Sequence, residues 1–202
     1  TAFLSNESGR LKRVLPALSF GINYYFAESF LNTFVFKITN LTIHLINTGL
    51  VYCLAFLLWP RLLKSTYPKI SITKQRLILF SAFTSLVWAL HPLQLTPVTY
   101  IVQRMSSMAG TFMLLGMCVF VVGRARVEGG ARNGIVYMWF GIVFGTILGL
   151  MCKENAALLP LYTGVIEYTL FNRTTVGKTK KHLIIFYCST LFIPVVAGLV
   201  YC

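Results

Sequence analysis

Long apolar runs separated by short polar stretches make up the hydrophobic pattern of this 202-residue chain. Runs of this length are typical of helices that cross a bilayer, because about 20 apolar residues span its ~30 Å hydrocarbon core. A soluble core would instead alternate polar and apolar faces. The pattern predicts six membrane-spanning helices, at residues 38–59, 77–90, 98–122, 135–152, 155–171 and 183–201.

Two segments depart from the simple pattern of spans. The run at 77–90 is short, so its flanks must enter the membrane or the bilayer must thin locally. Residues 14–36 are less apolar and carry polar side chains around the aromatic residues 24–26. This pattern favours an exoplasmic interfacial helix with an aromatic anchor, and a seventh span is the weaker alternative. The expected fold class is therefore all-α: a polytopic transmembrane helical bundle with about six spans and one interfacial helix.

Two regions follow from this interpretation. Residues 1–37 are expected to form an exoplasmic loop that contains the interfacial helix, and residues 38–202 to form the transmembrane bundle. The sequence starts without Met and stops inside an apolar run, so we expect both ends to be cut and the chain to be a fragment.

Basic residues are concentrated in three of the connections. The connections 60–76, 123–134 and 172–182 hold 12 of the 18 lysines and arginines, whereas 91–97 and 153–154 are tight turns. The positive-inside rule places the three basic connections in the cytoplasm and the tight turns on the exoplasmic side. The net charge of +13 does not indicate nucleic-acid binding, because the basic residues form no continuous face.

Polar side chains inside the spans are candidate site residues, since such groups are costly in hydrocarbon. One helical stripe of the first span and its flank carries Lys37, Asn40, His44 and Asn47. We favour interhelical hydrogen bonding as its role, with a cavity lining as the alternative.

The third span has a second polar stripe. Its members are Thr96, Thr99, Gln103, Ser106 and Gly110. Arg104 lies beside this stripe, and an arginine inside a span is expensive unless it meets an anion, a carboxylate or water. We therefore expect Arg104 to bind an anion; the alternative is a structural ion pair, for which Glu154 is the candidate partner.

Other residue patterns favour structural roles. Gly141, Gly145 and Gly149 repeat every four residues, which is typical of a face where a second backbone comes close. His44 and His91, in a chain without aspartate, do not favour a metal site, and we predict none.

Three stretches resemble, in the same order, the polytopic C-type (GT-C) glycosyltransferases. They are TNLTIHL at 39–45, HPLQLTPVTYIVQRMSSMAG at 91–110, and KEN at 153–155 with Pro160. The likeness is nearest to bacterial members that often carry tetratricopeptide repeats and to the eukaryotic tetratricopeptide-repeat O-mannosyltransferases. It covers most of residues 9–171, with departures at Val14, where the family usually has proline, and at Leu95-Thr96, where it often has Thr-Glu.

The resemblance implies a membrane enzyme that moves a sugar from a polyprenyl-phosphate-linked donor to an exoplasmic acceptor, either protein or glycan. Its partners would be this donor, membrane lipids and the acceptor. Arg104 would hold the donor phosphate, because a guanidinium matches two phosphate oxygens. The cavity would be lined by Asn40, His44, Gln103, Lys153 and Glu154. We predict no cofactor, and leave a divalent cation open for the full-length enzyme.

The family's catalytic acidic residue follows its first span, and we expect it to lie upstream of this sequence. The catalytic residue of the chain is therefore unknown. The alternative function is a non-catalytic membrane subunit that packs on partner helices through faces such as that of Gly141, Gly145 and Gly149. The expected location is the bacterial inner membrane, with the endoplasmic reticulum membrane as the alternative.

Overall fold

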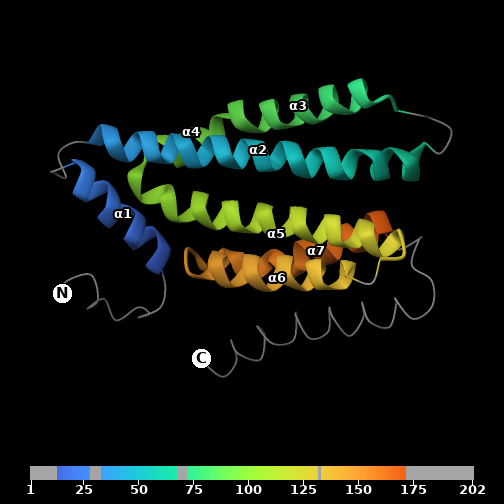
Figure 1. Ribbon diagram of the computed structural model, residues 1–202. Coiled ribbons are helices and arrows are strands. Elements are labelled where there is room, and N and C mark those ends of the chain that lie inside the picture. The colour runs from blue at the N-terminus through green and yellow to red at the C-terminus, as the bar shows by residue number, and fades with distance from the viewer. Residues whose placement is uncertain (1–12, 28–32, 68–71, 132, 172–202) are drawn as a thin grey trace.

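The computed structural model describes residues 13–27, 33–67, 72–131 and 133–171, and all regular elements in these residues are helices. The long helices run back and forth beside one another (Figure 1). The all-α class is thus confirmed for the described part of the chain. The expected basic connection at 172–182 and the expected span at 183–201 lie outside the described residues.

The first two helices differ from their predicted bounds. Helix α1, Val14–Ala27, has 14 residues and a length of about 21 Å, too short to cross a ~30 Å hydrocarbon core. Helix α2, Thr33–Thr66, has 34 residues and continues through Pro60, where the sequence predicted a connection. One proline removes a single backbone donor, and Arg61 donates a side-chain hydrogen bond to the carbonyl of Leu57 in the same turn, at 2.8 Å.

A bent segment joins α3 to α5. Helix α3, Lys74–Leu90, is followed by the 3₁₀ turn Pro92–Gln94 and the short helix α4, Leu95–Thr99, which together bend from α3 by 59°. His91 precedes a proline and is extended, as this position favours. Its Nδ1 accepts the N–H of Leu93 at 3.2 Å, so His91 caps the turn.

The third predicted span starts later and ends later than expected. Tyr100 is extended, and after the turn Ile101–Gln103 helix α5 runs from Arg104 to Glu128, through residues assigned to a loop from the sequence. Helix α6, Gly134–Leu150, follows. The predicted span 155–171 is not one α-helix but three short pieces: η3, Glu154–Leu158, α7, Leu159–Ile166, and the π-turn η4, Glu167–Phe171.

Two helical segments are long and apolar enough to cross a membrane. They are Thr33–Thr66 and Ile101–Glu128, and the bent pair Lys74–Leu90 and Pro92–Thr99 makes a third if it is one span. Large apolar side chains such as Leu79 and Phe83 are about two-thirds exposed, which suits a lipid environment better than water. These features indicate a membrane protein.

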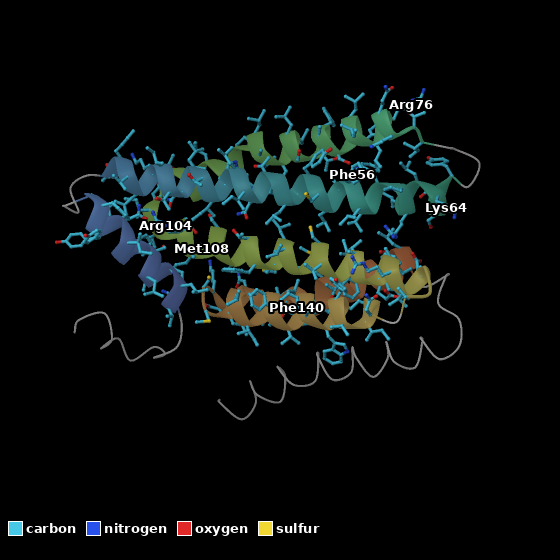
Figure 2. All side chains as sticks on the ribbon, viewed as in Figure 1. Phe56, Lys64, Arg76, Arg104, Met108 and Phe140 are labelled. Atoms are coloured by element: carbon cyan, nitrogen blue, oxygen red, sulfur yellow. The ribbon has the colours of Figure 1, made fainter. Side chains whose placement is uncertain are left out.

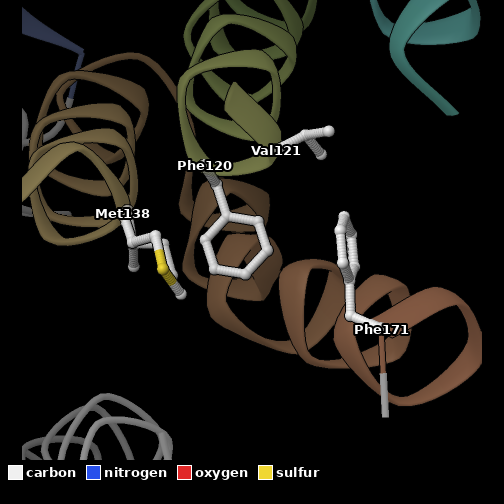
Figure 3. Packing of buried hydrophobic residues seen from close by; sticks show 5 residues of the cluster. Phe120, Val121, Met138 and Phe171 are labelled. Atoms are coloured by element: carbon white, nitrogen blue, oxygen red, sulfur yellow. The ribbon is translucent and has the colours of Figure 1, made fainter. Parts of the chain in front are cut away.

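The apolar core lies where α5, α6 and η4 meet. Phe120 and Val121 of α5 pack with Met138 and Ile142 of α6 and with Phe171, and all five are almost fully buried (Figure 3). The core thereby fixes Phe171, the last described residue, against α5 and α6.

Helices α5 and α6 approach each other through glycines. A Cβ atom added to Gly141 would lie 2.7 Å from the carbonyl oxygen of Gly116, well inside van der Waals contact. Cβ atoms added to Gly145 and Gly149 would come within 2.8 and 2.5 Å of side chains in α7 and η3. The face predicted from the four-residue repeat is therefore occupied by neighbours within the chain. The partner glycine on α5 was not singled out from the sequence.

Candidate functional site

Two ends of the bundle can be distinguished. The α1 end consists of residues 13–27, 33–44, 91–107 and 149–156, and the basic end of residues 59–67, 72–76, 123–131, 133–137 and 166–171. Helices α2, α5 and α6 run between these ends (Figure 1). Arg104 and the expected cavity-lining residues all lie at the α1 end; the latter are Asn40, His44, Gln103, Lys153 and Glu154.

Arg104, the first residue of α5, has no exposed surface. Its Nε donates to Oδ1 of Asn40 at 2.8 Å, its Nη1 to Oδ1 of Asn23 at 2.7 Å, and its Nη2 to the carbonyl of Phe36 at 2.9 Å. Nη1 also lies 3.3 Å from Oγ and 3.4 Å from the carbonyl of Ser19. Arg104 thus connects α1, α2 and α5, and Figure 2 shows it between these helices.

All hydrogen-bond acceptors of Arg104 are neutral. The rings of Phe20 and Phe36 add cation–π contacts, with centroids 4.5 and 5.7 Å from the guanidinium carbon. The ion pair with Glu154 that we considered is not formed, because Glu154 is exposed to solvent and the acceptors of Arg104 come from other residues. In this arrangement the guanidinium is enclosed by its own chain and is not open to a phosphate.

The polar stripe of α2 faces its neighbouring helices. Asn40 donates to the carbonyls of Val98 and Tyr100, at 3.4 and 3.2 Å, at the break in the helix before α5. The carbonyl of Tyr100 also accepts the N–H of Gln103, at 3.1 Å. Asn47 donates to the carbonyl of Ser107 at 3.0 Å. This is the interhelical bonding that we favoured.

His44 belongs to the same interface. Its Nε2 lies 3.2 Å from the carbonyl of Ala89, and its ring stacks on Trp88 with centroids 5.4 Å apart. Asn40 and His44 are both buried, 1% and 9% exposed. The predicted role of lining an open cavity therefore does not fit their positions in this structure. Lys37, the first member of the predicted stripe, is exposed.

A surface cluster forms where α5 meets η3. Lys153 Nζ donates to Oγ of Ser106 at 2.8 Å, and Ser106 in turn donates to Oε1 of Gln103 at 3.0 Å. Gln103 is exposed, and Ser106 and Lys153 are half-buried. We call Gln103, Ser106 and Lys153 the Lys153 cluster. An ammonium has three donors, and only one is used here, so the cluster can bind an anion.

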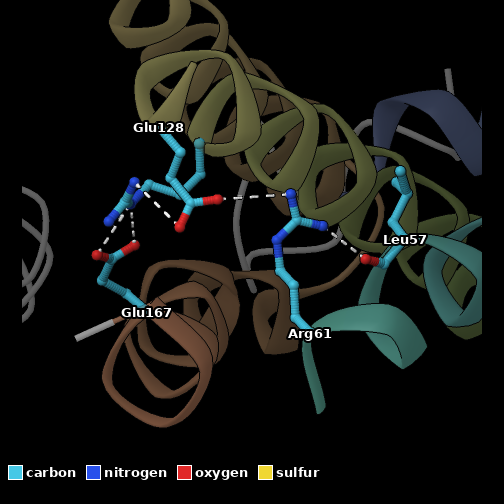
Figure 4. A network of polar contacts seen from close by, with 5 residues as sticks. Leu57, Arg61, Glu128 and Glu167 are labelled. Atoms are coloured by element: carbon cyan, nitrogen blue, oxygen red, sulfur yellow. Dashed lines mark hydrogen bonds and ion pairs between the residues drawn. The ribbon is translucent and has the colours of Figure 1, made fainter. Parts of the chain in front are cut away.

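A second buried arginine lies at the basic end, and sequence analysis missed it. Arg124, 1% exposed, donates from Nε to both carboxylate oxygens of Glu167, at 2.9 and 3.0 Å. Glu128 joins it to Arg61, with N···O distances of 4.0 Å to Arg124 and 3.7 Å to Arg61 (Figure 4). Both arginines lie 4.9 Å from the ring centre of Phe171. The four-residue spacing of Arg124 and Glu128 was the available signal, but the region was interpreted as a loop.

Within the described ranges, no group of three or more His, Cys, Asp or Glu side chains comes together in a way that could hold a metal ion. The two described histidines serve other roles, in the α2–α3 interface and in the turn before α4.

The chain matches no protein-family model, and neither the curated proteins nor the solved structures that we searched contain a significantly similar chain.

Proposed function

We propose that this chain is part of a membrane glycosyltransferase that takes a sugar from a polyprenyl-phosphate-linked donor and passes it to an exoplasmic acceptor. One observation carries the proposal: the three stretches that resemble this enzyme family meet at the α1 end. Asn40 bonds to the backbone of Val98 and Tyr100, Arg104 bonds to Asn40, and Lys153 bonds to Ser106. Residues far apart in the sequence thereby build one polar region.

We assign binding of the donor phosphate to Lys153. Its ammonium is half-buried beside Ser106 and Gln103, which supply a hydroxyl and an amide for further contacts. Arg104, the residue that the resemblance implies for this role, would become a positioning residue that holds α1 and α2 around the region. It would reach a phosphate only after α1 moved away, because Ser19 and Asn23 of α1 occupy its Nη1.

The proposed topology has six spans, with the basic end in the cytoplasm and the α1 end on the exoplasmic side. Helix α1 would lie in the membrane interface, since it is too short to cross. We propose the bacterial inner membrane as the location; the endoplasmic reticulum membrane is the alternative.

Binding of undecaprenyl phosphate, and of dolichyl phosphate in parallel, to the purified protein tests the proposal. The Lys153→Gln variant should bind at least about tenfold more weakly, because one charge-assisted contact is lost. Lys37→Gln is the matched control, since Lys37 is an exposed lysine at the same end outside the cluster. Wild-type protein that binds neither lipid phosphate, or Lys153→Gln protein that binds like wild type, would refute the assignment.

A non-catalytic membrane subunit remains the alternative class of function. It was expected to contact partner helices through Gly141, Gly145 and Gly149. That face packs on α5, α7 and η3 of the same chain, so the alternative would need another surface.

A further inference from the structure

The basic end of the bundle carries more positive charge than its carboxylates neutralise. Its described residues include two glutamates, Glu128 and Glu167. They include six basic residues: Arg61, Lys64, Lys74, Arg76, Arg124 and Arg126. An excess of four positive charges therefore remains at this end.

The two carboxylates are already engaged inside the bundle. Glu167 binds the buried Arg124 through both oxygens, and Glu128 contacts Arg124 and Arg61. Arg126 lies over the ring of Tyr137, 4.1 Å from its centroid. With Arg61 and Arg124 paired in this way, the four excess charges fall on Arg126 and on the three residues Lys64, Lys74 and Arg76.

Lys64, Lys74 and Arg76 lie on adjoining helix ends. Lys64 is in the last turn of α2, and Lys74 and Arg76 are in the first turn of α3, which packs against α2. All three are exposed, and no carboxylate in the described part of the chain forms an ion pair with any of them. Figure 2 shows Lys64 and Arg76 at the same end of the molecule.

The length of α2 sets the depth of these charges. At about 51 Å, α2 exceeds the ~30 Å hydrocarbon core, so one or both of its ends must extend into the headgroup region. Trp59, which donates to Oγ1 of Thr84 at 3.2 Å, is of the residue type that favours the membrane–water boundary. Lys64 is about 7.5 Å further along the helix axis, so a Trp59 at this boundary would place Lys64 at the depth of lipid phosphates.

We propose that Lys64, Lys74 and Arg76 form a binding site for anionic phospholipid headgroups in the leaflet at the basic end. Ammonium and guanidinium groups donate charge-assisted hydrogen bonds to phosphodiester oxygens, and juxtamembrane basic residues are attracted to anionic lipid surfaces. A zwitterionic headgroup cancels this attraction with its own ammonium. The site is independent of the proposed sugar transfer.

Lipid selectivity of the complete protein in nanodiscs tests this site. The discs contain phosphatidylcholine and a minor fraction of spin-labelled phosphatidylglycerol or phosphatidylcholine, and the immobilised fraction of each label is measured. The variant Lys64→Gln/Lys74→Gln/Arg76→Gln should show a preference for phosphatidylglycerol that is lower by about threefold or more. Added salt should lower the preference of the wild-type protein for phosphatidylglycerol. Lys37→Gln, at the other end of α2, should leave the preference unchanged.

A second variant separates charge from folding. Lys64→Arg/Lys74→Arg/Arg76→Lys keeps all three charges and should keep the preference for phosphatidylglycerol. The site would be refuted if the glutamine variant kept the wild-type preference at low salt, or if the charge-preserving variant lost it. Efficient displacement of the labelled lipid by soluble glycerophosphate would also refute it, because the site would then bind free phosphates rather than a lipid surface.

Discussion

Arg104 is a buried cation whose contacts determine how α1 sits on the bundle. A guanidinium without a carboxylate partner is stable here because five oxygen acceptors and two aromatic rings surround it. Removing it would leave Asn23, Asn40 and the carbonyl of Phe36 without this donor in an interior that water does not reach. Each such loss is costly, since buried polar groups must be satisfied.

Arg104→Ala should therefore destabilise the protein by about 3 kcal/mol or more, and Arg104→Lys should restore little, because an ammonium lacks the planar fork. Thermal unfolding in detergent measures both. Gln103→Ala, which alters the exposed neighbouring residue, is the control and should change stability by less than about 1 kcal/mol. An Arg104→Ala protein as stable as wild type would contradict the structural role.

The Arg124–Glu167 pair is the strongest ion pair among the described residues. It is nearly buried and its Nε donates to both carboxylate oxygens, whereas the pairs of Glu128 are longer and partly exposed. Geometry of this kind makes loss of one partner more damaging than loss of both, because a buried charge is left alone.

We expect Glu167→Ala to lower the free energy of unfolding by about 3–5 kcal/mol. The double variant Arg124→Met/Glu167→Met should recover part of this loss, and Glu128→Gln should cost about 1 kcal/mol or less. Chemical unfolding of the wild type and these three variants measures the free energies of unfolding. Equal effects of Glu167→Ala and Glu128→Gln would show that burial of the pair is unimportant.

At the scale of elements, the contact between α5 and α6 depends on small residues. Backbones come close at Gly116 and Gly141, and a side chain on either would collide with the other helix. In lipid, helices associate mainly through van der Waals contact, because burying apolar surface against another helix releases no water. A loss of close approach between α5 and α6 therefore has no compensating hydrophobic gain.

Gly141→Val should separate α5 from α6 and lower the unfolding temperature by several degrees or prevent folding, and Gly141→Ala should have a smaller effect of the same sign. Gly49→Ala is the matched control, because nothing lies within 4 Å of the Cβ that it adds in helix α2. It should be neutral or slightly stabilising. A similar loss in Gly49→Ala and Gly141→Ala would argue against specific packing.

Helix α1 has its polar face toward the bundle. Asn23 is buried and bonds to Thr39 at 2.7 Å, whereas the exposed face carries large apolar side chains. These side chains are Leu18, Ile22, Tyr25 and Phe26. A short helix with this reversed pattern suits an interfacial position, with its apolar face toward lipid.

At the scale of the whole molecule, the alternation of connections between two ends is the feature with the clearest functional consequence. The turns at His91 and Lys153 lie at the α1 end, and the basic end holds the last turns of α2 and α5 and the first turns of α3 and α6. In a membrane, these two ends would face opposite compartments.

Single cysteines in a background without the five natural cysteines test this topology. Leu93→Cys and Asn155→Cys should react with an impermeant maleimide added from outside, because both positions are exposed at the α1 end. Ala131→Cys, exposed in the connection after α5, should react only after permeabilisation. The reverse labelling pattern would invert the proposed orientation, and labelling of all three from outside would rule out the alternation.

Much of the fold could be predicted because its signals are local. Apolar runs gave the helical class and the order of the helices, and the spacing of Gly141, Gly145 and Gly149 gave a close-packed face. Helix bounds were less predictable. Pro60 did not end α2, and α5 continued beyond Val122, because neighbouring helices and side-chain contacts stabilise turns that local preference would end.

By itself the sequence determined that this is an all-α membrane protein whose basic residues are grouped between its apolar runs, because hydrophobicity and charge depend on residue type and spacing alone. Only the tertiary structure decided what the polar residues do. It enclosed Arg104, Asn40 and His44 between helices, joined Lys153 to Ser106, and paired Arg124 with Glu167. The physical reason is that burial and partner choice depend on which helices meet, and such contacts join residues 43 to 85 positions apart.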